Sequence, residues 1–172
     1  MRKVLAIGIL FGLCSLSAFA AEKDYPKGEF FGGYQYSHPE GGVNANGFDF
    51  ALNGNFNNYF GITADLGSSF TTQNGVSLHN YTYTFGPQLS LRTNRAYTPF
   101  VHLLIGGDHA SASVGDVSVT GNGFALLGGG GVDINFNRYM AFRGGADWMM
   151  THSNGVTSSK NVRMVTGIVF RY

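Results

Sequence analysis

The sequence predicts an all-β fold, an eight-stranded antiparallel up-and-down transmembrane β-barrel, from three observations. Apolar and polar residues alternate over eight segments of about ten residues, the length that a tilted strand needs to cross a bilayer. Charged residues make up only 12% of the chain, while aromatic residues reach 15% and glycines number 26. No long apolar run follows the first twenty residues, which excludes a helical membrane protein.

The first twenty residues are predicted to be a secretory signal peptide. Arg2 and Lys3 give the segment a positive start, an apolar run follows at residues 4–16, and small residues precede the expected cleavage site. The apolar run is too short to span about 30 Å of hydrocarbon as a helix. We therefore expect a signal peptide at residues 1–20 and a β-barrel domain at residues 21–172.

The predicted mature chain contains no cysteine, because the only one, Cys14, lies in the signal peptide. Its stability is therefore expected to come from backbone pairing and packing rather than from disulfides. The formal net charge of the whole chain is only +1, and no basic stripe is present. Nucleic acid is consequently not expected as a partner.

The end of the chain shows the alternation most clearly. From Val162 to Tyr172 one face is mostly apolar and ends in aromatic residues, whereas the other face carries Arg163 and Arg171. A soluble sandwich would turn the polar face outward. A transmembrane barrel reverses this, with lipid on the apolar side and a polar lumen within.

Eight segments alternate in this way, an even number, as bacterial single-chain barrels require. The predicted strands are residues 28–37, 47–56, 59–70, 78–92, 98–110, 122–135, 139–151 and 162–172. Short turns are predicted at residues 57–58, 93–97 and 137–138, and longer loops at 38–46, 71–77, 111–121 and 152–161. Short turns are typical of the periplasmic end of such barrels, so both termini are expected there.

Ten charged residues on the inward faces predict a lumen plugged by paired charges. Sorted by depth, they form one layer near the periplasm and one near the outside, where His102 joins them. The first layer holds Glu29, Arg92, Asp133, Arg143 and Arg171, and the second Asp49, Asp65, Asp108, Asp147 and Arg163.

Buried charges must be paired, and the interior of an eight-stranded barrel is just wide enough for side chains to fill it. Because the last strand closes on the first, Glu29 and Arg171 are expected to be neighbours. The plug is expected to block large solutes, with a narrow ion path as the alternative.

Histidines give the only enzyme-like pattern. His109 and Ser111 share one strand face, as a nucleophile and its base would need, but Asp108 points to the opposite face and completes no triad. The histidines expected near the outer rim have no local ligand spacing, so no metal site is predicted. They are His38, His79, His109 and His152.

These features together resemble the outer-membrane β-barrel family typified by the OmpA transmembrane domain and by OmpX. The shared features are the signal peptide, the eight alternating strands and the ending Gly167-Ile168-Val169-Phe170-Arg171-Tyr172. The resemblance implies that Ile168, Phe170 and Tyr172 form the signal read by the barrel-assembly machinery. OmpA-type proteins often continue into a peptidoglycan-binding domain, and this sequence ends at Tyr172, so cell-wall anchoring is not carried over.

The expected function is that of a non-enzymatic protein of the bacterial outer membrane that contributes to envelope structure or to surface interaction. The alternatives are a lipid-modifying enzyme similar to lipid A deacylases, with His109 and Ser111 as candidates, and a narrow ion channel. Outer-membrane lipids and the barrel-assembly machinery are the expected partners. The protein is expected to be a monomer without a cofactor.

Overall fold

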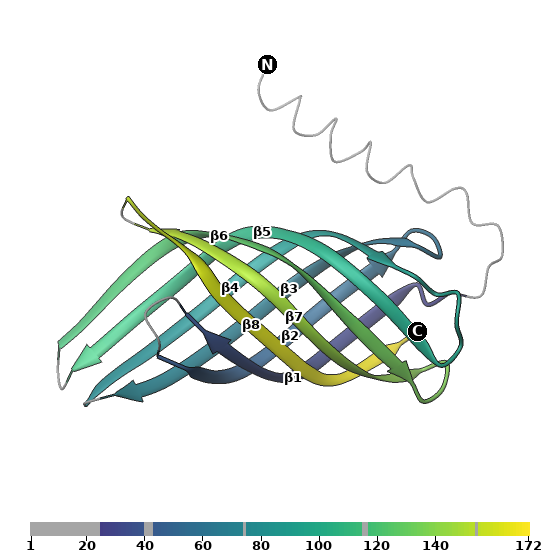
Figure 1. The fold of residues 1–172 in the computed structure, drawn as a ribbon, viewed down its shortest axis with the longest axis horizontal. Coiled ribbons are helices and arrows are strands. Elements are labelled where there is room, and N and C mark those ends of the chain that lie inside the picture. Colours follow the sequence, from purple (N-terminus) through teal and green to yellow (C-terminus); the bar gives the residue numbers. More distant parts are fainter. Residues whose placement is uncertain (1–24, 40–42, 74, 115–116, 154) are drawn as a thin grey trace, which may run out of the picture.

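The computed structural model describes residues 25–39, 43–73, 75–114, 117–153 and 155–172, which form a closed antiparallel barrel. Each strand pairs with its neighbours in sequence, and the last pairs with the first (Figure 1). The strands are β1 Gly28–His38, β2 Ala45–Asn55, β3 Phe60–Gln73, β4 Val76–Ser90, β5 Tyr97–Val114, β6 Val117–Asn135, β7 Met140–Ser153 and β8 Val156–Arg171. The predicted eight-stranded barrel is confirmed. The predicted signal peptide lies outside the described residues.

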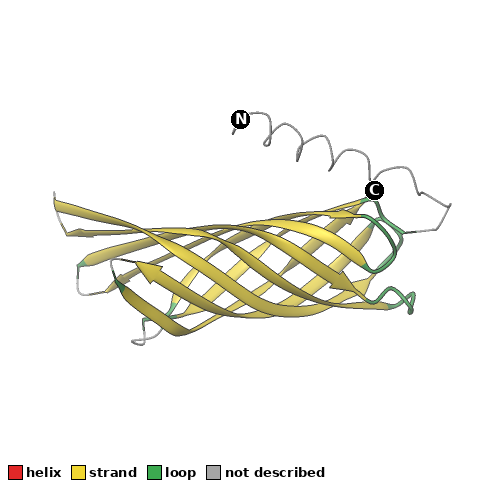
Figure 2. Cartoon of the chain, turned by 90° about the horizontal axis from the view of Figure 1, so that it is seen from above, coloured by secondary structure: helices red, strands yellow, loops and turns green. Residues whose placement is uncertain are grey.

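The strands run obliquely to the long axis of the barrel, which has two distinct ends (Figures 1 and 2). β1 begins and β8 ends at one of them, together with the β2–β3, β4–β5 and β6–β7 connections; we call this the terminal end. The pairs β1–β2, β3–β4, β5–β6 and β7–β8 are joined at the other, which we call the hairpin end. Within the described ranges no helix is long and apolar enough to cross a membrane.

The predicted long loops at the hairpin end are wrong in three of four cases. Residues 71–77, 111–121 and 152–161 belong mostly to strands, whose pairing continues to Gln73 with Val76 and to Ser153 with Val156. Gly75 and Gly155 both have a φ of 79°, the left-handed conformation that tight hairpin turns require. An Asn-Gly dipeptide occurs at residues 74–75 and again at 154–155, and it is the sequence signal for such turns.

At the terminal end the predicted strand boundaries are closer to those of the structure. Most of the strands there end one or two residues earlier than predicted, so that Tyr59, Arg92, Tyr139 and Tyr172 lie in the connections or beyond the last strand. The turns are correspondingly slightly longer than expected. The predicted asymmetry in connection length is therefore wrong, because the three terminal-end connections have four to six residues, whereas three of the four at the hairpin end have two.

Burial alternates along the strands with a period of two, as the sequence predicted. In β2 every second residue is buried, from Ala45 to Asn55, and the residues between them are exposed. Large apolar side chains cover the outside, among them Leu52 at 61% and Phe85 at 60% exposure. Strand geometry turns successive side chains to opposite faces, so this outer belt is suited to lipid and the polar residues line the lumen.

The interior is not polar throughout. Two apolar clusters lie among the polar side chains of the lumen. One consists of Phe31, Ala51, Ala141 and Val169, and the other of Leu104, Ala125, Leu127 and Met149. They fill space between the charged groups and reduce the room left for water.

Close backbone approach at the closing seam requires glycine. Gly33 of β1 and Gly167 of β8 are register partners, and a Cβ added at Gly33 would lie 2.3 Å from the carbonyl oxygen of Thr166. Replacing Gly33 with valine is therefore expected to lower the free energy of unfolding by about 1–3 kcal/mol. Urea unfolding in lipid vesicles measures this change. Gly54→Val is the control, because a Cβ there meets nothing within 4 Å, and an equal loss in both variants would contradict the prediction.

Candidate functional site

The charged groups near the terminal end form a continuous network inside the barrel. The Arg171 guanidinium donates to Glu29 Oε1 at 2.8 Å and to Asp133 Oδ2 at 2.7 Å. Arg143 donates to both oxygens of Asp133, at 2.7 and 3.0 Å, and Arg92 donates to Glu29 Oε2 at 3.3 Å. All five side chains are at most 9% exposed. We call Glu29, Arg92, Asp133, Arg143 and Arg171 the terminal-end layer.

Neutral groups complete this layer. Asn53 Nδ2 donates to Glu29 Oε2 at 2.9 Å, so that carboxylate has partners on both oxygens. The Arg143 guanidinium lies 4.3 Å from the ring centroid of Phe100 and 5.4 Å from that of Phe31. A planar guanidinium can form two parallel bonds to a carboxylate while its faces rest on aromatic rings. Arg143 is held in this way by Asp133, Phe31 and Phe100.

Arg163 is the centre of the second group of charges, nearer the hairpin end. Its guanidinium, 1% exposed, donates to Asp49 at 2.8 Å, to both oxygens of Asp65 at 2.8 and 3.1 Å, and to Asp147 at 2.8 Å. His102 Nε2 lies 2.7 Å from the other oxygen of Asp147. One cation thus links four strands through three carboxylates. We call Asp49, Asp65, His102, Asp147 and Arg163 the hairpin-end layer.

Strand register explains which of these contacts are local. Asp147 and Arg163 are direct cross-strand partners, as are Glu29 and Arg171. Facing side chains of neighbouring strands are close enough to pair. The contact of Arg163 with Asp65 instead crosses the lumen, and Gly67 makes room for it, since a Cβ there would lie 3.2 Å from Arg163 Nη1.

Asp108 does not join either network, contrary to the sequence-based expectation. It faces inward on β5 and is 7% exposed, but it forms no ion pair within the described part of the chain. Its Oδ1 accepts no hydrogen bond from any described residue. Its register partners are Thr82 and Gly123, neither of which carries a charge. Alternation predicted its face correctly but could not supply a cation at its depth.

The space between the two layers is nearly filled. A cavity of only about 10 Å³ remains there, bounded by Phe31, Gln88, Phe100, Arg143 and Arg163. A single water needs roughly that volume. The two layers and the apolar side chains between them therefore close the lumen at this level.

The whole barrel also matches a known family. A family model described as an outer membrane protein beta-barrel domain matches residues 6–167. The chain belongs to this family. It is an outer-membrane β-barrel protein of the Gram-negative type, and the resemblance stated from the sequence is confirmed.

Solved outer-membrane barrels share the fold. Ail, the attachment invasion locus protein of Yersinia pestis, has 19% identity and a TM-score of 0.61, over 86% of this chain and 99% of that one. Neisserial surface protein A has 10% identity and a TM-score of 0.70, covering 84% and 96%. OprG from Pseudomonas aeruginosa has 12% identity and a TM-score of 0.61, covering 88% and 99%. No curated protein sequence matches this chain significantly. At these identities the likeness shows the fold alone.

Strand alternation places the candidate catalytic pair on the outward face of this outer-membrane barrel, close to the hairpin end, where Ser111 also borders a cavity of the lumen. His109 Nδ1 contacts Asn122 Oδ1 at 2.7 Å, and Ser111 faces His79 and Thr120 on the neighbouring strands. Asp108 faces the lumen, so it does not orient His109. Nucleophilic catalysis needs a base that is itself held by a third group, and the described residues place no carboxylate against His109.

Two of the other three rim histidines of the outer-membrane barrel are held by near neighbours as well. His38 contacts Asn44 at 2.6 Å, and His152 contacts Thr157 at 2.7 Å. Among the described residues no three histidine, cysteine or acidic side chains come together to hold a metal ion.

The C-terminal strand of the outer-membrane barrel presents its apolar residues outward. Phe170 is 48% and Tyr172 83% exposed, and Ile168 lies on the same face. The Tyr172 carbonyl accepts hydrogen bonds from the backbone of Lys27 and Gly28. Tyr172 is therefore fixed to the start of β1, with its ring on the outside against Gly28.

Proposed function

We propose that this protein is a non-enzymatic component of the outer membrane, acting in envelope structure or surface contact, with a lumen that does not conduct. The observation that carries the proposal is the pair of buried ion networks, with a cavity of about 10 Å³ between them. A solute would have to break several charge-assisted hydrogen bonds to pass. Among the described residues no carboxylate hydrogen-bonds to His109, whose partner is Asn122, and this also favours a non-enzymatic role.

The proposed orientation has both ends of the barrel chain in the periplasm and the hairpin end outside. Support comes from the position of both ends of the barrel chain at the terminal end, and from the long β5–β6 pair, which extends at the opposite end as extracellular segments of bacterial barrels do. Export by the signal peptide and insertion by the barrel-assembly machinery belong to the same proposal. The outward row of Ile168, Phe170 and Tyr172 is accessible to such a machinery before the barrel closes.

Surface contact is supported by the length of two strands. β5 has 18 residues and β6 has 19, whereas β1 and β2 have 11 each. A tilted strand crosses the bilayer with about 9–11 residues, so the β5–β6 pair extends well past the membrane at the hairpin end. Two structural relatives are described as a surface protein and as an attachment invasion locus protein. A projecting paired hairpin is a rigid element that a surface-contact role can use.

Recording ion currents tests the closed lumen. Purified barrel inserted into a planar lipid bilayer is expected to give no steady unitary conductance, because charged side chains in two layers fill the lumen. A porin in the same bilayer is the positive control, and recovery of inserted protein from the membrane confirms insertion. Reproducible single-channel openings of the unmodified protein would overturn the proposal in favour of a narrow ion channel.

A further inference from the structure

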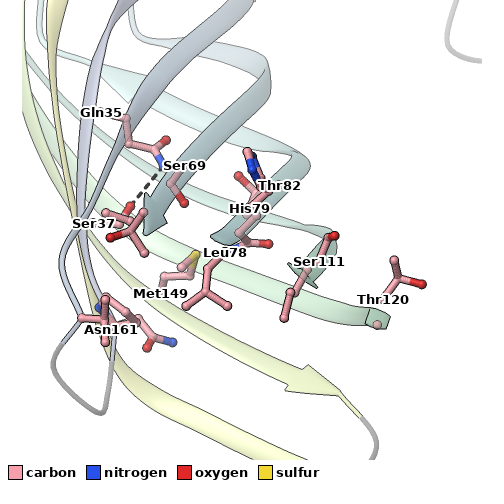
Figure 3. Close-up of a pocket in the computed structure, with 18 of the residues that line it drawn as sticks. Gln35, Ser37, Ser69, Leu78, His79, Thr82, Ser111, Thr120, Met149 and Asn161 are labelled. Carbon is pink, nitrogen blue, oxygen red and sulfur yellow. Dashed lines mark hydrogen bonds between the residues drawn. The ribbon is translucent and has the colours of Figure 1, made fainter. Parts of the chain in front are cut away.

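A cavity of about 420 Å³ lies in the lumen on the hairpin-end side of the plug. Its volume falls in the range of small-molecule sites, about 300–1,000 Å³. All eight strands contribute to its lining, and the hairpin-end layer lies directly beneath it. Figure 3 shows the labelled side chains of its wall, from Gln35 and Ser37 on one strand to Met149 and Asn161 on others.

The wall of this cavity exposes mainly apolar surface, although ten of its nineteen lining residues are polar. Ala45, Leu78, Ala110, Ala112 and Met149 supply small or flexible apolar surface. Binding sites for small molecules commonly combine such a wall with a few placed polar groups. An occupant with an apolar body therefore fits the wall, and the polar groups decide its chemistry.

The unsatisfied polar atoms at this wall are acceptors. Gln35 is 3% exposed and donates through Nε2 to Ser37 Oγ at 3.1 Å, but its Oε1 accepts no hydrogen bond from the described residues (Figure 3). Asn80 Oδ1 is in the same situation. Asp108 is not part of the lining, but it lies one inward position below Ala110 and opposite Thr82, and its carboxylate has an oxygen without a partner among those residues. Buried acceptors without partners favour a ligand that brings donors.

The charges of the lumen are unequally divided between its two ends. In the hairpin-end layer three carboxylates surround one guanidinium, and Asp108 lies on the same side. In the terminal-end layer two carboxylates face three guanidinium groups. A low-dielectric wall focuses such a field, so the cavity attracts cations and repels anions.

We propose that this cavity binds a small organic cation, a primary ammonium carried on an apolar body. The ammonium donates to Gln35 Oε1 and Asn80 Oδ1, with the carboxylate of Asp108 adding charge beneath them. The apolar body lies against Leu78, Ala110 and the other apolar residues of the wall. The inference goes beyond the proposed function, because it adds a binding site to a barrel that does not conduct. Since the plug closes the lumen below the cavity, the ligand enters and leaves at the hairpin end.

Three probes of similar shape and different charge test the proposal. They are phenethylammonium, 2-phenylethanol and 3-phenylpropionate, titrated by saturation-transfer NMR against the protein in lipid nanodiscs, with empty nanodiscs as the reference for lipid partitioning. The cation is expected to bind at least about tenfold more tightly than the alcohol, and the anion not to bind. Equal binding of cation and alcohol, or no binding of the cation beyond the empty discs, would overturn the proposal.

Variants then locate the site. Ala110→Trp fills the cavity and is expected to abolish binding, whereas Ser113→Trp, on the outward face of the same strand, is the matched control and should leave it unchanged. Asp108→Asn keeps the shape and is expected to weaken the cation about three- to tenfold without affecting the alcohol. Unchanged binding in Ala110→Trp, or equal weakening of both probes by Asp108→Asn, would count against the assignment.

Discussion

Replacing Arg163 with alanine is expected to lower the free energy of unfolding by about 3–5 kcal/mol, the loss typical of removing one partner from a buried ion pair. Without the guanidinium, Asp49, Asp65 and Asp147 remain together in the lumen, and within the described ranges His102 is the only basic group in contact with them. Urea unfolding in lipid vesicles, followed by the fluorescence of Trp148, measures the change. Trp148 is the only tryptophan and lies on the outer face at 44% exposure.

Two further variants separate lost charge from lost packing. Arg95→Ala, an exposed arginine in the β4–β5 connection, should change stability by no more than about 0.5 kcal/mol. Adding Asp65→Asn to Arg163→Ala should recover part of the loss, because it removes repulsion between the remaining carboxylates. Wild-type stability of Arg163→Ala would show that the hairpin-end layer does not hold the plug.

The fold could be predicted because alternation acts on every strand independently. Asp147 and Arg163 are polar residues between outward apolar neighbours, and this alone sets their face. Strand ends at the hairpin end are different, because residues there such as Thr120 and Ser158 are polar on both faces of the strand, and their polarity does not distinguish strand from loop. Only residues that favour tight turns mark these strand ends. The Asn-Gly pairs at residues 74–75 and 154–155 are such a signal, but they fall inside the longer predicted loops.

The ion pairs of the lumen were predictable where the strand register alone brings the two residues together. Glu29 and Arg171 were expected together because closure fixes their register, and they are partners. The contact of Arg163 with Asp65 across the lumen depends on the stagger of all strands, which no single segment specifies. The cavity was missed because part of its wall, including Ala112, falls in a predicted loop at residues 111–121.

Replacing Asp133 with alanine is the second change expected to remove about 3–5 kcal/mol of stability. Arg143 makes both of its carboxylate contacts to Asp133, at 2.7 and 3.0 Å, and Arg171 donates to the same carboxylate at 2.7 Å. After the substitution three buried guanidinium groups share the single carboxylate of Glu29. Removing Arg171 instead leaves two cations against two carboxylates, so Arg171→Ala should be milder. Urea unfolding of both variants measures the order.

Asp108→Ala is the matched control for Asp133→Ala, since both remove an inward aspartate from the same barrel. Asp108 has no ion pair among the described residues, so its removal should change stability by less than about 1 kcal/mol. Adding Arg143→Met to Asp133→Ala should restore part of the loss, because a flexible apolar side chain between Phe31 and Phe100 needs no counter-charge. Equal losses in Asp108→Ala and Asp133→Ala would mean that any inward aspartate stabilises the barrel by solvating the lumen. The specific pairing of Asp133 with Arg143 would then carry no more stability than an unpaired carboxylate.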